Sequence, residues 1–97
     1  LEWRVRQLRQ LRALLTEHDK DLAEALYQDL HKGAAEAHAA EIDFPVREID
    51  HTLDNLEDWL YPESLSPEAL TGFPEGSTAG TRYDPLGVVL VIAPWNY

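Results

Sequence analysis

The sequence contains no cysteine among its 97 residues. It can therefore form no disulfide, no thiolate metal site and no thiol nucleophile. Methionine is also absent, even at position 1, so we expect this chain to be part of a longer protein. No apolar run approaches the roughly 20 residues that a membrane span needs, and there is no signal-peptide pattern. We expect a soluble, cytoplasmic protein.

Basic residues are scarce. Eight lysines and arginines stand against eighteen aspartates and glutamates, which gives a net charge of -10 at pH 7. Because an acidic surface repels phosphate groups, nucleic acid is not an expected partner. The acids fall at ordinary spacing on the polar sides of helices, and no pair stands out from the rest. We interpret them as solvated helix faces rather than as acid/base pairs.

Apolar residues recur at intervals of three and four through the first sixty positions, a spacing typical of amphipathic helices. The pattern predicts a first helix at about 1–16 and a second at about 19–32. Thr16 or Asp19 is a suitable N-cap for the second helix, and Lys32 with Gly33 supplies a cationic last turn and a stop.

The most regular pattern predicts a third, long helix at about 35–60, with six apolar positions spaced by four and three: Ile42, Val46, Ile49, Leu53, Leu56 and Leu60. Pro45 lies inside this pattern, where its ring would clash with the carbonyl group of Glu41. We therefore expect a kink or a helix start at Pro45. The three helices make 1–60 an N-terminal helical segment.

The composition changes at 61–80, which contains three prolines and three glycines and lacks the helical spacing of apolar residues. This composition predicts a long connector. Within 81–97, "TRY" and the run from Val88 to Ile92 are strand candidates on either side of a "DPLG" turn. The second run is apolar on both faces, as in a strand covered on both sides within a parallel α/β sheet.

Three motifs with possible chemistry favour ordinary interpretations. His31, His38 and Glu41 could supply metal ligands, but nothing in their spacing enforces a site, so surface histidines are the better interpretation and no metal is predicted. "GSTAG" lacks the lysine and the helix of a phosphate-binding loop, so it is interpreted as a turn. "APWNY" is a candidate ligand-contacting turn at a strand end, although from its residues alone a plain turn is favoured.

The segment "PLGVVLVIAPWNY" resembles the aldehyde dehydrogenase family, whose members carry a PxGVxxxIxPWN-type segment. The upstream segments "DLHKG" and "TRYDPLG" are also similar to this family. "EIDHTLDNLEDW" and the tyrosine after "PWN" are more similar to its class 3 branch than to classes 1 and 2. The resemblance implies an α/β fold in which N-terminal helices lead into the first strand of a Rossmann-like cofactor domain, incomplete in this chain. It also implies that 81–97 combines a strand of the bridging and oligomerisation region with that first strand.

The resemblance further implies oxidation of an aldehyde to a carboxylic acid with NAD or NADP, by a cysteine and a glutamate that lie outside this chain. By the same resemblance, Asn96 is the catalytic donor to the substrate oxygen, and Tyr97 lies at the substrate tunnel. Ile92, Ala93, Pro94 and Trp95 are implied to lie along the cofactor. A homodimer or homotetramer is implied for the full-length protein.

Two alternatives stay open. A superfamily member that makes acyl-CoA esters from semialdehydes would share "PWN". From a different class, the chain could be an acidic helical interaction module that binds a partner helix along 42–60. The apolar strand argues against such a module, because it would leave an exposed edge that is prone to aggregation.

Overall fold

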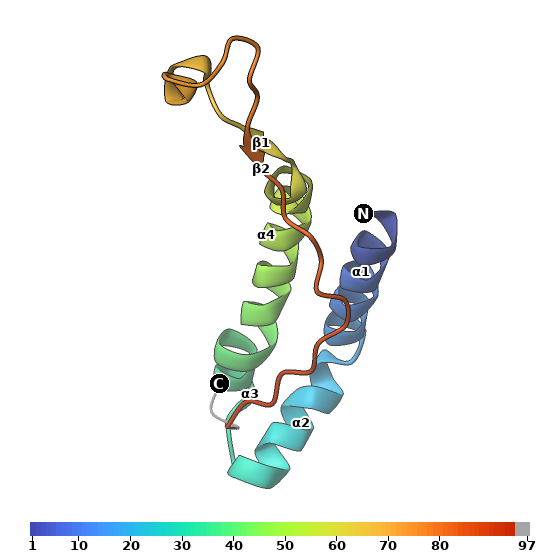
Figure 1. Cartoon of the computed structure of the whole chain (residues 1–97). Coiled ribbons are helices and arrows are strands. Elements are labelled where there is room, and N and C mark those ends of the chain that lie inside the picture. The colour runs from blue at the N-terminus through green and yellow to red at the C-terminus, as the bar shows by residue number, and fades with distance from the viewer. Residues whose placement is uncertain (95–97) are drawn as a thin grey trace.

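A computed structural model of the chain describes residues 1–94 (Figure 1). Its elements are, in chain order, α1 (Glu2–Glu17), α2 (Asp19–Leu30), α3 (Ala34–Ala37), a π-helical turn η1 (His38–Ile42), α4 (Asp43–Leu60), β1 (Glu63–Ser64), a 3-10 turn η2 (Pro67–Leu70) and β2 (Gly80–Thr81). The observed architecture is a helical unit with a small two-stranded sheet.

The molecule is elongated, with principal extents of 66 × 25 × 22 Å. Its radius of gyration is 20.4 Å, whereas a compact domain of this length would have about 13 Å. In Figure 1, α1 lies beside the long helix α4, α2 continues from α1 at the lower end, and the β1–β2 arm projects from the far end of α4. The shape indicates that the described residues do not close around one core.

The first two helices differ from their predicted ends. The N-cap of α2 is His18, without a side-chain capping bond, and not Thr16 or Asp19. The Thr16 hydroxyl group instead donates to the carbonyl groups of Arg12 and Ala13, at 3.1 and 3.2 Å, as helical threonines often do.

At its other end α2 stops at Leu30, earlier than predicted, because His31 and not Gly33 takes the left-handed conformation, with φ of 54°. Histidine is among the residues that tolerate this conformation. The His31 N–H donates to the carbonyl oxygen of Tyr27 at 2.7 Å, and the two rings are in contact, which closes the helix end.

Three consecutive helical pieces occupy the region of the predicted third helix. In the π-helical turn η1, the N–H of Asp43 donates to the carbonyl oxygen of His38, five residues back. Helix α4 begins at Asp43, so Pro45 lies in its first turn, directly after the π-helical turn. The wide π-helical turn before Pro45 accommodates a proline that a regular α-helix would not.

The core is small. Ala23 of α2, Ala37 of α3 and Ile42 of η1 form one buried cluster, with Leu22 and Leu26 packed against it. Ile49 is the other buried residue among those described, on the face of α4 that lies towards α1. All the buried side chains are apolar, and they tie α2 and α4 together through the short helices between them.

The predicted connector contains some regular structure. Strands β1 and β2 pair antiparallel, with Glu63 opposite Thr81 and Ser64 opposite Gly80. A Cβ atom at Gly80 would lie 2.5 Å from the carbonyl oxygen of Glu63, so the close pairing requires glycine there. The pairing makes the connector an arm that folds back on itself.

The strand predicted at Val88–Ile92 does not form: residues 82–94 contain no helix or strand. Of the strand predicted at "TRY", only Thr81 is in a strand, β2. The physical reason is that a strand exists only with a hydrogen-bonded neighbour. None of the described backbone is positioned to pair with the run from Val88.

Candidate functional site

The segment that the sequence singles out for chemistry lies at the C-terminal end. Ile92, Ala93 and Pro94 are exposed, Ile92 to 78%. Trp95, Asn96 and Tyr97 lie outside the described residues. The structure therefore places three of the four predicted cofactor contacts on an open surface and gives no geometry for the predicted catalytic and substrate residues.

The apolar run before this segment is almost fully open to solvent. The exposed fraction is 94% for Leu86, 93% for Val88 and 84% for Leu90. The run crosses in front of the helical unit in Figure 1 without packing into it. A run of this kind buries its side chains only when another surface covers it.

One ion pair links helices distant in sequence. The Arg12 guanidinium in α1 donates to both carboxylate oxygens of Asp50 in α4, from Nε at 2.6 Å and from Nη2 at 3.1 Å. The hydrogen bond and the charge of Asp50 raise the pKa of Arg12. The hydrogen bond from Arg12 holds the pKa of Asp50 below its usual range. Sequence patterns gave no signal for this pair, because its members lie 38 positions apart.

A second group of charges surrounds the π-helical turn. Lys32, after α2, forms an ion pair with Glu41 in η1. His38 lies between two carboxylates: its Nε2 is 3.9 Å from Asp19 Oδ2, and its Nδ1 is 3.6 Å from Asp43 Oδ1. The contacts of Asp19 and Lys32 link the start of α2 and the loop after this helix to the π-helical turn, whereas the contact of His38 with Asp43 is local, between residues five positions apart.

The histidine constellation weighed in the sequence does not assemble as a metal site. Glu41 is engaged by Lys32, and His31 is in contact with the ring of Tyr27. Asp19 lies beside Nε2 of His38, and Asp43 lies beside Nδ1. A metal ion bound to one of these ring nitrogens would therefore be close to only one of the two carboxylates. Within residues 1–94, no group of three or more acidic, histidine or cysteine side chains could hold a metal ion.

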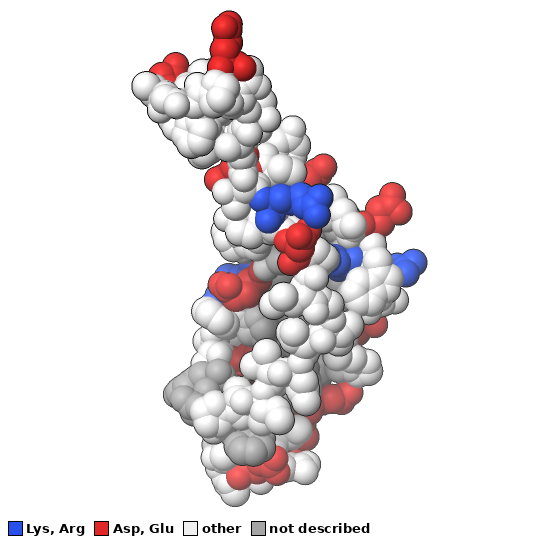
Figure 2. Space-filling model, viewed as in Figure 1, with Lys and Arg blue, Asp and Glu red and all other residues white. Residues whose placement is uncertain are grey.

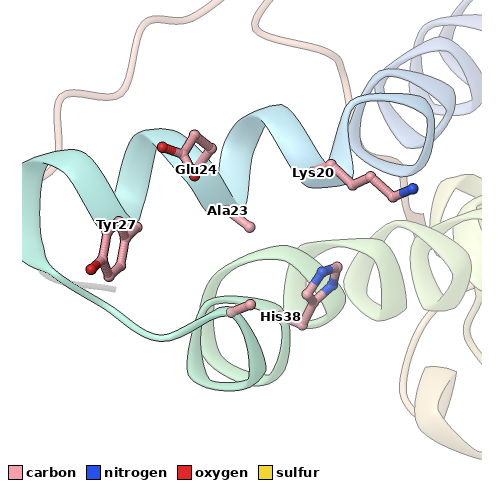
Figure 3. Close-up of a pocket in the computed structure, with 6 residues that line it drawn as sticks. Lys20, Ala23, Glu24, Tyr27 and His38 are labelled. Carbon is pink, nitrogen blue, oxygen red and sulfur yellow. The ribbon is translucent and has the colours of Figure 1, made fainter.

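An open depression of about 400 Å³ lies where α2 faces α3 and the π-helical turn (Figure 3). It is lined by Lys20, Ala23, Glu24, Tyr27, Ala34 and His38. In Figure 3 the His38 ring projects towards α2, near Ala23 and Lys20, whereas Tyr27 and Glu24 lie further along that helix. The depression is shallow and mainly apolar, and no unpaired polar group is buried in it.

Charge is unevenly distributed over the surface. On the face shown in Figure 2, acidic side chains occur at both ends and the middle, while basic side chains gather around the middle. Within residues 1–94, no helix has both the length and the apolar character to cross a membrane.

Comparison with known proteins identifies the chain. Residues 1–97 match the aldehyde dehydrogenase family. The chain belongs to this family. It is 42% identical over 96 residues to aldehyde dehydrogenase family 3 member B1 of Mus musculus, an alignment that covers 99% of this chain and 20% of that protein. The match confirms the resemblance seen in the sequence, including its class 3 branch.

Two further family members come from other lineages. The chain is 41% identical over 96 residues to family 3 member I1, chloroplastic, of Arabidopsis thaliana, covering 99% of this chain and 17% of that protein. It is 38% identical over 97 residues to the dimeric NADP-preferring aldehyde dehydrogenase of Canis lupus familiaris, covering 100% and 21%. The chain therefore spans about a fifth of the length of these relatives. No solved structure matches it significantly.

Proposed function

We propose that this aldehyde dehydrogenase chain is the N-terminal part of an enzyme that oxidises an aldehyde to a carboxylic acid with NAD or NADP. The observation that carries the proposal is the family match over residues 1–97, with relatives about 40% identical along the whole chain. The nucleophilic cysteine would belong to the remainder of such an enzyme, because this sequence contains no cysteine. The resemblance to the family implies the same for the glutamate that activates water.

In this proposal, residues 88–92 form the first strand of a Rossmann-like cofactor domain once neighbouring strands are present. The support is the uncharged, largely β-branched run and its exposure in the described structure. Exposed apolar strand residues are stabilised when paired and covered, at roughly 25 cal/mol per Å² of apolar area removed from water. The helical unit would then support this strand rather than carry chemistry.

Residues 92–94 fit one aspect of cofactor binding. Ile92, Ala93 and Pro94 are exposed, uncharged and without side-chain hydrogen-bond donors. They suit a wall against a flat ring and carry nothing that would bind a phosphate group. NAD or NADP, when bound, supplies the acceptor for the substrate's hydride. These residues would limit where its ring can lie and would keep water from that side.

Asn96 supplies the chain's own contribution to the reaction in this proposal. When a nucleophile adds to an aldehyde, the carbonyl oxygen gains negative charge, so a donor at that oxygen stabilises the transition state more than the ground state. The Asn96 amide group donates without titrating, so it stays a donor over the alkaline range in which a thiolate is abundant. Tyr97 would contact the aldehyde along its approach.

The test is to assay the full-length protein that carries this chain with an aldehyde and NAD or NADP. We expect reduced nicotinamide and a carboxylic acid as products. The isolated 97 residues should give neither, because they hold no activated nucleophile. A product formed only with coenzyme A, as an acyl-CoA ester, would establish the acylating alternative. Absence of reduced nicotinamide with a panel of aldehydes and both cofactors would contradict the proposal.

A further inference from the structure

Basic side chains are concentrated at the start of an otherwise acidic chain. Residues 1–12 contain four arginines and one glutamate, whereas the rest of the chain contains four basic and seventeen acidic residues. Of these arginines, only Arg12 has an ion-pair partner within residues 1–94, and that partner is Asp50 of α4. Arg6 and Arg9 are exposed. The N-terminal half of α1 therefore presents unpaired positive charge to solvent.

Unpaired acids lie at the neighbouring end of α4. Helices α1 and α4 run antiparallel side by side, so the first turns of α1 lie level with the last turns of α4 (Figure 1). Asp54 and Glu57 are exposed, and neither has an ion-pair partner among the described residues. The last turn of α4 contains no basic residue, although the helix dipole favours positive charge there. Both helix ends thus carry charge that the described part of the chain does not neutralise.

The pitch of the helices explains why these charges do not meet within one copy. Arg9 and Arg6 come three and six residues before Arg12, so at 100° per residue they turn by about 60° and about 120° from the direction in which Arg12 contacts Asp50. Asp54 and Glu57 come four and seven residues after Asp50 and stay within about 40° of its direction. The two arginines and the two acids therefore point outwards from the same face of the α1–α4 layer.

An open groove adds apolar surface beside the two arginines. Its volume is about 540 Å³, and it is lined mainly by apolar atoms of α1, including those of Val5 and Ala13. On α4, Leu53 and Leu60 lie four residues before and three residues after Glu57, and both are half-buried. They therefore flank the acids on one side of that helix. This apolar surface bears on binding because exposed ion pairs alone contribute little.

We propose that this face binds a second copy of the chain, with α1 of each copy against α4 of the other. A two-fold axis parallel to the helices keeps α1 antiparallel to the α4 that it faces, at the same level as in the Arg12–Asp50 pair. Arg9 then faces Asp54 of the second copy and Arg6 faces Glu57 of the second copy, because both pairs are spaced three residues along their helices. The proposal depends neither on the C-terminal run nor on the proposed catalytic function.

Sedimentation velocity of the 97-residue chain over a concentration series measures this association. All samples carry Val88→Ser and Leu90→Ser, which reduces association through the exposed C-terminal run. Arg6→Glu with Arg9→Glu, and separately Asp54→Lys with Glu57→Lys, should each weaken the dimer at least about tenfold, because like charges then face each other. An equal mixture of these two variants should form the dimer again, since each reversed face then meets its complement.

Lys20→Glu with Arg82→Glu is the matched control. It changes the net charge by the same amount as the arginine reversal, but at positions in α2 and after β2. It should leave the association unchanged. Helical circular dichroism of every variant checks folding, and we expect no loss, because the helix dipole prefers acids near the start of α1 and bases near the end of α4. A monomer at all concentrations, a mixture that does not associate, or a control that weakens the dimer equally would overturn the proposal.

Discussion

Residues 1–60 and residues 61–94 differ in how much structure they hold by themselves. The four buried side chains all lie in the first region, at Ala23, Ala37, Ile42 and Ile49. In the second region no described residue is buried, Leu70 is half-buried, and the exposed fraction of its other large apolar side chains runs from 51% at Leu65 to 94% at Leu86. The first region therefore buries some of its apolar side chains although others, such as Trp3 and Leu30, are exposed, whereas the second region buries none that the structure describes.

The difference follows from where hydrogen-bond partners lie. A helix satisfies its backbone within four or five residues along the chain, so its hydrogen bonds need no partner that is distant in sequence. A strand depends on a neighbour that can be far away in sequence. The helical region therefore contains the hydrogen-bond partners for its own secondary structure, whereas the function proposed for the C-terminal region depends on residues outside this chain.

The largest expected effect concerns the C-terminal region. In the full-length enzyme, Asn96→Ala should lower the rate of hydride transfer by about 10² to 10³, the usual loss for one oxyanion donor, and should leave cofactor affinity nearly unchanged. Pre-steady-state formation of reduced nicotinamide at saturating cofactor measures this.

Asn96→Asp provides the charge control for the same experiment. It should be at least as damaging, because an ionised carboxylate repels the oxyanion that an amide would stabilise. If a folded Asn96→Ala enzyme forms reduced nicotinamide at the wild-type rate under conditions in which hydride transfer limits that rate, then "APWNY" is only a turn.

A matched pair of substitutions compares the two regions directly. Ile42→Ala, at a side chain only 4% exposed, should lower the urea concentration at which the helical signal is half lost, because the truncation removes contacts from a small core. Leu90→Ala, at 84% exposure, should have almost no effect. Urea titration of the 97-residue chain, followed by far-ultraviolet circular dichroism, measures both. Equal effects would show that the tail is packed as well as the helices are.

Dye binding tests the openness of the second region. The 97-residue chain should show helical circular dichroism, a broad rather than steep thermal transition, and fluorescence of a hydrophobic dye. Val88→Lys combined with Leu90→Lys should weaken dye binding without changing the helical signal, because both side chains are exposed outside the helical unit. A monodisperse monomer with a steep transition and no dye binding would instead favour the self-contained interaction module.

The smallest expected effect is the acid dependence of the Arg12–Asp50 pair. The pKa of Asp50 is lowered in the folded chain, so the stability from this pair is present above the ordinary aspartate pKa of about 3.9. It is lost as the pH falls through the lowered folded value.

Helical content between about pH 5 and about pH 2, compared for wild type and Asp50→Asn, isolates this contribution. The wild type should lose its advantage over the variant as the pH falls. An unchanged advantage at the lowest pH would show that the pair contributes nothing through its charge.

Family membership and the helical character of the first sixty residues could be predicted because both depend on local patterns. The end of α2 at Leu30 could not, because the left-handed residue that follows it is His31, beside the Tyr27 ring, and not the glycine two positions later that the pattern favours. The Arg12–Asp50 pair depends on how two helices meet, which spacing within either helix does not encode. The roles of Ile92, Pro94 and Asn96 stay predictions, since they depend on surfaces outside the described residues.

The π-helical turn sets the rotational phase of everything that follows it. Ala37 and Ile42 are five positions apart and both buried, although five steps of about 100° along an α-helix would separate two side chains by about 140°. The wide turn absorbs one extra residue and so brings both side chains to the same side. Deleting one residue from His38–Ile42 should therefore give a straighter helix that turns Ile49 and Asp50 away from α1, even though every remaining side chain is retained.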